Sequence, residues 1–227
     1  MITNGTRASD PADPVPPMSD PVILHDYFRS SAAWRVRIVL ALKGVAYRHV
    51  AVNLLANEQR DPAYLAINPQ GIVPTLEIDG LTLTQSLAII DYLDARFPDP
   101  PMVPRDPAAR SRVLAKALVI GADIHPINNL RVLRYLKHEL AVDDTARDAW
   151  YAHWVREGFI ALEAMAQADG TAFLSGDTPG IADACLIPQL FNARRFHVAV
   201  EDYPRLLAIE ATALAMDAFA STHPDRV

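Results

Sequence analysis

The stretch RSSAAWRVRIVLALKG, residues 29–44, decides the fold of the first half of the chain. From Val36 onward its apolar residues recur at i, i+3 and i+4, the spacing of a helix that packs on a core. Gly44 follows the last periodic residue, where glycine commonly ends a helix. The spacing therefore predicts a helix over 33–43, directly after a mostly apolar strand over 22–28.

Two adjacent hydroxyls, Ser30 and Ser31, stand at the start of this helix. A helix start needs only one capping hydroxyl, so the second is available for another partner. A hydroxyl there can donate a hydrogen bond to a thiolate, which the positive end of the helix also stabilises. The stretch itself holds no cysteine, and a site that holds a thiol belonging to something else could use the second hydroxyl.

The rest of the chain divides into a mixed half and a helical half. Asp79-Gly80 is a dipeptide typical of a hairpin turn, and the five prolines of 97–107 predict a stiff linker. The expected elements are a strand over 47–53, a looser helix near 61–67, a hairpin over 75–84, a helix from a Ser86 cap to Phe97, and helices over 108–139, 144–168, 181–196 and 204–219. The predicted division is a disordered extension 1–20, an α/β domain 21–100 and an all-helical domain 107–227, and Met18 is a possible natural start.

Composition excludes several classes of function. The net charge of −6 argues against a general nucleic-acid or anionic-membrane surface. Cys185 is the only cysteine and lies in an apolar run, so we expect a buried core residue and no internal disulfide, as suits a reducing cytosol. The seven histidines do not cluster at ligand spacing, so no metal site is predicted. No apolar run is long enough to span a membrane.

Two short segments of the first half are candidate binding elements. Val73-Pro74 precedes a strand, and a cis Pro74 would leave the Val73 backbone free to pair with an extended peptide, although a trans proline at a strand start is commoner. Gln85 and Ser86 lie at a helix start, where free N–H groups favour a carboxylate, although a simple N-cap at Ser86 is commoner than a ligand site.

The helical half offers a third cluster. His125 and Asn129 are four residues apart and are expected to share a helix face, with Arg131 close by and Pro126 bending the helix. A solvated polar face explains the cluster equally well. The adjacent Arg194 and Arg195 end a later helix, where favourable interaction with the helix dipole explains them without a ligand.

Together these motifs resemble the zeta-class glutathione transferases from about Val22 to about Phe219. RSSAAWRVRIVLALKG is similar to the class signature SSCxWRxRIALxLKG, and NPQGIVPTL and TQSLAIIDYL are similar to the glutathione-binding turn and helix start. The resemblance implies the glutathione transferase fold, with a thioredoxin-like first domain and a helical second domain. It also implies glutathione as cofactor and a cytoplasmic homodimer.

The resemblance also assigns residues to roles. It implies that Ser30 and Ser31 support the glutathione sulfur, so that both are catalytic. It implies that Gln59, Val73, Pro74, Gln85, Ser86, His125, Asn129 and Arg131 bind glutathione, and that Arg29, Arg131 and Arg195 bind substrate carboxylates.

The activity implied is glutathione-dependent cis–trans isomerisation of maleylacetoacetate, an unsaturated diketo acid of aromatic amino acid catabolism. Maleylpyruvate is the nearest competing substrate, and Leu130, where that enzyme is expected to carry an arginine, favours maleylacetoacetate. Two more functions stay open on the sequence alone: transfer of glutathione to α-haloacids, and a silent module that serves in protein interaction.

Two departures from the family pattern stand out. Ala32 occupies the position of the signature cysteine; we expect activity to survive because the reaction needs only the sulfur of glutathione. The helix-capping box, usually Thr-x-x-Asp, begins here with Gly180 and keeps only its Asp183 half.

Overall fold

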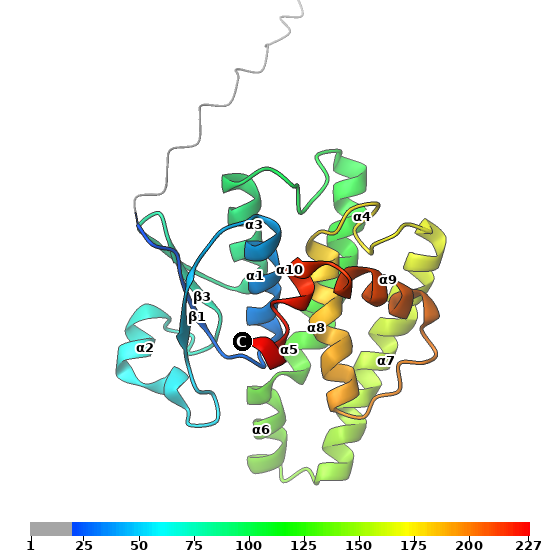
Figure 1. Ribbon diagram of the computed structural model, residues 1–227. Coiled ribbons are helices and arrows are strands. Elements are labelled where there is room, and N and C mark those ends of the chain that lie inside the picture. The colour runs from blue at the N-terminus through cyan, green and yellow to red at the C-terminus, as the bar shows by residue number, and fades with distance from the viewer. Residues whose placement is uncertain (1–19) are drawn as a thin grey trace, which may run out of the picture.

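The computed structural model describes residues 20–227, in which a four-stranded sheet with helices on both faces precedes an all-helical part (Figure 1). The strand order is β2-β1-β3-β4, with β1 parallel to β2 and antiparallel to β3, and β3 antiparallel to β4. Helix α2 lies on one side of the sheet, and α1 and α3 on the other. The elements are β1 (Ile23–Asp26), α1 (Ser31–Leu42), β2 (Arg48–Ala51), η1 (Glu58–Arg60), α2 (Pro62–Ile67), β3 (Thr75–Ile78), β4 (Leu81–Thr84) and α3 (Ser86–Arg96).

The second part contains helices only, and no strand follows β4 within residues 20–227. The predicted class, α/β followed by all-α, is confirmed, and we infer the division at the proline-rich linker. None of the described helices is long and apolar enough to cross a membrane. The elements are α4 (Pro107–Leu118), η2 (Val119–Ile124), α5 (His125–Asn128), α6 (Leu130–His138), α7 (Asp144–Asp169), α8 (Ile181–Arg195), α9 (Pro204–Leu214), α10 (Asp217–Ala220) and η3 (Pro224–Arg226). Of the predicted extension 1–20, all but the last residue falls outside the described part, and so does Met18.

Helix α1 ends at the predicted glycine stop but begins earlier than predicted. At its start the Ser30 Oγ accepts a hydrogen bond from the Ala33 N–H at 3.3 Å, so Ser30 is the N-cap and the helix begins two residues before the predicted start. At its end Gly44 has a φ of +65°, and the Val45 N–H reaches back to the Leu40 carbonyl. This is the left-handed cap that glycine favours.

The hairpin turn is also as predicted, but the cap of the next helix is not. Asp79 and Gly80 both have positive φ, as a type I′ turn requires. The sequence predicts Ser86 as the cap of α3; instead Gln85, with a φ of 68°, is the N-cap, and Ser86 is the first helical residue. The Ser86 hydroxyl therefore does not cap the helix; it is buried and accepts a hydrogen bond from Arg35.

The single helix predicted over 108–139 is wrong. The backbone widens to a π-helical segment at η2, Pro126 brings no N–H donor to the next turn, and Asn129 is extended with a ψ of 163°. The Asn129 side chain accepts from the Val132 N–H and starts α6, so His125 and Asn129 do not share one helix face. The helix predicted over 204–219 breaks likewise, because Met216 is extended.

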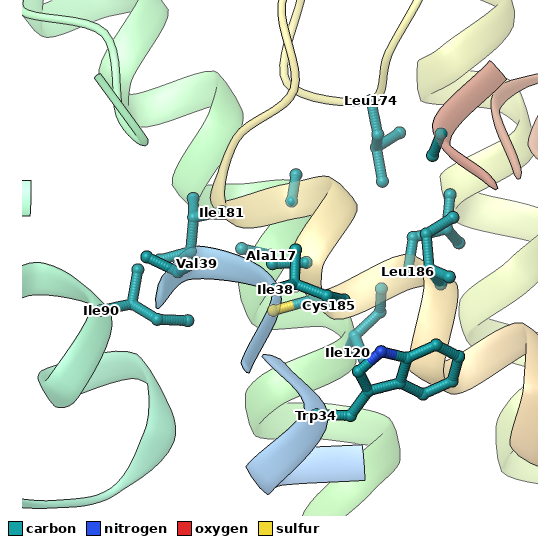
Figure 2. Packing of buried hydrophobic residues seen from close by; sticks show 14 of the residues in the cluster. Trp34, Ile38, Val39, Ile90, Ala117, Ile120, Leu174, Ile181, Cys185 and Leu186 are labelled. Carbon is teal, nitrogen blue, oxygen red and sulfur yellow. The ribbon is translucent and has the colours of Figure 1, made fainter. Parts of the chain in front are cut away.

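The core joins the two parts through α1. In Figure 2, Trp34, Ile38 and Val39 of α1 lie with Cys185 and Leu186 of α8 in one apolar cluster. Cys185 is fully buried, and burial raises the pKa of its thiol, which confirms it as a core residue.

The start of α8 depends on a buried carboxylate. Asp183 accepts hydrogen bonds from the N–H groups of Gly180, Leu174 and Ser175, at 3.0, 2.6 and 3.1 Å. Gly180 brings no hydroxyl, and Ser175 supplies it from the preceding loop, its Oγ accepting from the Ala182 N–H at 3.1 Å. The sequence shows only the Asp183 half of the capping box, and Ser175 supplies the missing hydroxyl.

Replacing Asp183 by alanine should lower the free energy of unfolding by about 3 kcal/mol, because three N–H groups lose their acceptor, each worth roughly 1 kcal/mol. Urea denaturation measures the difference. Asp177→Ala, at an exposed position of the same loop, is the control and should change stability little. Equal stability of the two variants would contradict the role given to Asp183.

Candidate active site

A cavity of about 540 Å³ lies where α1, the β2–α2 loop, the turn before β3 and the start of α3 meet η2, α5, α6, α7 and α8. Every residue that sequence reasoning selected for the site lines this cavity, although the residues come from segments far apart in the chain. They are Arg29, Ser30, Ser31, Gln59, Val73, Pro74, Gln85, Ser86, His125, Asn129, Arg131 and Arg195.

Three serine hydroxyls of the cavity are held in the same way. Each oxygen accepts a hydrogen bond from an N–H of the protein: Ser30 from the Ala33 backbone, Ser31 from Asn192 at 2.6 Å, and Ser86 from Arg35 at 3.3 Å. No described residue accepts a hydrogen bond from any of the three hydroxyls, so each keeps its own hydrogen for a ligand. The site is therefore built to donate to an anion at both helix starts.

The turn before β3 presents free backbone and amide groups. The Val73–Pro74 peptide is cis, and within the described residues neither the N–H nor the carbonyl of Val73 has a hydrogen-bond partner. The Gln59 Oε1 is likewise buried without a partner. An extended peptide that lay along Val73 would satisfy these groups, since unpaired backbone groups at a sheet end accept an added strand.

Arginines give the cavity its charge. Among the described residues that line it are six arginines and no aspartate or glutamate. Arg35 is buried, and desolvation lowers its pKa; its Nε and Nη2 have no partner. A cation in low dielectric without a counter-ion attracts an anion strongly, so this cavity is suited to a ligand with several carboxylates.

His125 is neutral in this setting. Desolvation, and then the charges of Arg35 and Arg131, lower the pKa of its imidazole to about 3. A neutral ring carries one donor and one acceptor nitrogen, so His125 can hydrogen-bond a ligand without adding to the positive charge.

The adjacent arginines at the end of α8, Arg194 and Arg195, have different contacts. Arg194 forms two hydrogen bonds of 2.5 Å with the Glu210 carboxylate and does not line the cavity, whereas Arg195 does. The explanation by helix dipole alone is therefore incomplete for each of them.

Sequence reasoning missed several residues that line the cavity. Arg35 carried a signal, since a charged residue interrupts the apolar helix over 33–43; Asn192 carried another, since it precedes Arg195 by one helical turn on α8. Tyr151 gave none, because only the fold brings α7 to the site; burial raises its pKa to about 12. Arg60, Arg134 and Gln189 also line the cavity.

The neutral state of His125 is measurable. Between about pH 6.5 and about pH 3 the unfolded chain binds a proton at this ring and the folded protein does not, so this ring makes the free energy of unfolding fall as the pH is lowered through that window. In an NMR titration from about pH 8 to about pH 5, the His125 ring signals should not shift. His125→Gln assigns the signals, and a midpoint near the ordinary histidine pKa would contradict the assignment.

Comparisons with known proteins agree on one family. Residues 24–101 match the family "Glutathione S-transferase, N-terminal domain", and residues 144–209 match "Glutathione S-transferase, C-terminal domain". A maleylacetoacetate isomerase of Rhizobium meliloti is 46% identical over 210 residues, which are 92% of this chain and 99% of the relative.

Two solved structures share the fold. One is the holo structure of a maleylpyruvate isomerase, a bacterial glutathione S-transferase of the zeta class, with a TM-score of 0.88 and 41% identity over 90% of this chain and 98% of that chain. The other is a maleylacetoacetate isomerase of Anaeromyxobacter dehalogenans with glutathione bound in its active site, with a TM-score of 0.82 and 42% identity over 91% of this chain and 96% of that chain. The chain therefore belongs to the glutathione transferase family and, within it, to the zeta class.

Proposed function

We propose that this protein catalyses the glutathione-dependent cis–trans isomerisation of maleylacetoacetate to fumarylacetoacetate. The observation that carries the proposal is the cavity at the start of α1, where donor hydroxyls and six arginines converge without an acidic residue among the described lining. Glutathione and a diketo diacid together bring several carboxylates and one thiolate, which match that lining in charge.

The residues of the first half fit glutathione. The free N–H and carbonyl of Val73, before the cis Pro74, would pair with its peptide as an added strand. Gln85 and Ser86, at the start of α3, would hold its γ-glutamyl end, since N–H groups there attract a carboxylate. Gln59, with an unpartnered buried oxygen, and His125, Asn129 and Arg131 across the cavity would complete the binding set.

When bound, glutathione would supply the thiolate that adds reversibly to the cis double bond, permits rotation and departs unconsumed. Ser30 and Ser31 lie at the positive end of α1 and keep hydroxyl hydrogens for that sulfur. Hydrogen bonds to the charged form lower the pKa of a thiol, so both serines would raise the thiolate fraction at neutral pH.

The arginines would bind the substrate. Arg29, Arg131 and Arg195 are exposed at the cavity and carry positive charge there. They would hold the two carboxylates of the diacid and stabilise negative charge that develops on its carbonyl oxygen, as fixed cations in a partly desolvated site do.

Ala32 also lines the cavity, at the place of the family's signature cysteine. The proposed reaction needs no protein thiol, because the sulfur arrives with glutathione. The other sulfur that could have served, Cys185, is fully buried in the core.

Maleylpyruvate is the second candidate substrate, since one of the similar structures is a maleylpyruvate isomerase. Leu130 lines the cavity, 39% exposed, where we expect a further arginine in a maleylpyruvate enzyme. An apolar side chain at this point favours the longer maleylacetoacetate.

We also infer a cytoplasmic homodimer that acts on small molecules, in aromatic amino acid catabolism, without nucleic acid or membrane partners. Two exposed apolar side chains, Leu81 on β4 and Leu118 on α4, offer surface for a second copy, since burial of such side chains stabilises association.

The experiment that tests the function is a spectrophotometric assay of freshly prepared maleylacetoacetate and maleylpyruvate, each with and without glutathione. We expect isomerisation only with glutathione, no consumption of glutathione, and a higher kcat/KM for maleylacetoacetate. No activity on either substrate by the folded protein would contradict the proposal and favour α-haloacid conjugation or a silent module.

Ser30→Ala should lower kcat by about two orders of magnitude, the size seen when one donor to a reacting anion is removed. The variant also loses an N-cap, worth about 1 kcal/mol of stability. Asp106→Ala is the matched control, because Asp106 caps α4 in the same way, with its side chain accepting from the Ala109 N–H away from the cavity. It should lose similar stability and keep its turnover. Near-normal turnover of Ser30→Ala would remove Ser30 from the mechanism.

A further inference from the structure

Asn192 on α8 contacts both the proposed sulfur site and the proposed carboxylate site. Its Nδ2 donates to the Ser31 Oγ at 2.6 Å, and its Oδ1 accepts from the Arg195 Nη1 at 3.1 Å. Nothing in the family assignment gives this residue a role, and it lines the cavity.

Arg195 fixes which way the Asn192 amide points. A guanidinium has donors only, so the amide oxygen must face Arg195 and the amide NH₂ must face Ser31. The Ser31 oxygen is therefore an acceptor toward Asn192, and its single hydrogen is directed elsewhere. Ser31 is only 4% exposed, and the open side that remains is the cavity.

Ser30 and Ser31 differ in what orients them. The Ser30 oxygen is held by the backbone N–H of Ala33, which every helix start provides. Ser31 lies within the first turn of α1, where a free serine hydroxyl tends to donate to a nearby backbone carbonyl. Among the described residues no carbonyl accepts from the Ser31 hydroxyl, and the Asn192 N–H occupies one lone-pair direction of its oxygen, so α8 limits the directions left to the Ser31 hydrogen.

We propose that Asn192 is a positioning residue for the reaction: its amide, locked by Arg195, commits the Ser31 hydroxyl hydrogen to the sulfur of bound glutathione. The inference rests on the proposed function, because it requires glutathione in the cavity. The Asn192 amide would thereby connect Arg195, which would bind a substrate carboxylate, to Ser31, which would stabilise the thiolate.

The test is the thiol pKa of glutathione bound to the protein, followed by ultraviolet thiolate absorbance across pH. Asn192→Leu keeps the side-chain size and removes both hydrogen bonds. Because one hydrogen bond to a charged group is lost, the pKa of the bound thiol should rise by about one unit. Calorimetric affinity for glutathione well below that pKa should change little, so kcat falls more than KM rises.

The same substitution in a Ser31→Ala background separates positioning from a merely structural effect. If Asn192 acts through Ser31, Asn192→Leu should add no further shift once the hydroxyl is gone. An equal shift in both backgrounds would overturn the inference.

Asn192→Asp provides a second variant that keeps the shape and the Arg195 contact. Its carboxylate would accept the Ser31 hydrogen and turn it away from the sulfur, so the shift should be larger with Ser31 present than in Ser31→Ala. Asn53→Asp adds the same charge on a loop residue outside the cavity lining, whose Oδ1 accepts from the Leu55 and Ala56 N–H groups, and should leave the thiol pKa unchanged.

The outcomes distinguish this inference from the function on which it rests. Failure of the unmodified protein to bind glutathione, or to lower its thiol pKa, would overturn both. A lowered thiol pKa in the unmodified protein that Asn192→Leu leaves unchanged would overturn the role of Asn192 alone.

Discussion

The buried ion pair between Arg37 and Asp26 determines where the site can form. Both side chains are fully buried, and Arg37 also donates to the carbonyls of Phe28, at 2.9 Å, and Thr222, at 3.3 Å. A buried pair is tolerated only when further hydrogen bonds satisfy its charges, and these do so for the guanidinium. Asp26 ends β1 and Arg37 lies in the middle of α1, so the pair sets the turn between them and presents the first residues of α1 to the cavity.

The same contacts bring the end of the chain to this helix. Thr222 accepts from Arg37 with its carbonyl and from Trp34 with its hydroxyl, at 3.1 Å, so the segment after α10 covers α1 (Figure 1). Helix α1 is thereby enclosed by the sheet, by α8 and by the carboxyl-terminal segment. A helix held on all these sides keeps its first turn in place, which a site made of short hydroxyl contacts requires.

The sequence was informative wherever local chemistry decides the backbone. The apolar spacing after Ser31, Gly44 and Asp79-Gly80 predicted α1 and the hairpin because a helix period, a left-handed cap and a positive-φ turn are properties of neighbouring residues. It was wrong at Ser86, where Gln85 takes the N-cap position instead, and at Asn129, where a π-helical turn and an extended residue interrupt the predicted helix. All the predicted site residues line one cavity, whereas the roles of Arg35 and Asn192 depend on partners from other helices, Ser86 and Ser31, which the sequence alone does not pair with them.

The packing at the start of α8 restricts which residue can stand at position 180. A Cβ on Gly180 would lie 2.5 Å from the Met102 carbonyl oxygen and 2.9 Å from the Ser175 Oγ. Any side chain at position 180 would clash with the Met102 backbone as well as with the loop hydroxyl, and removing that hydroxyl would leave the Ala182 N–H without an acceptor. Glycine at position 180 and the hydroxyl of Ser175 are thus required together at the start of the helix that carries Asn192 and Arg195.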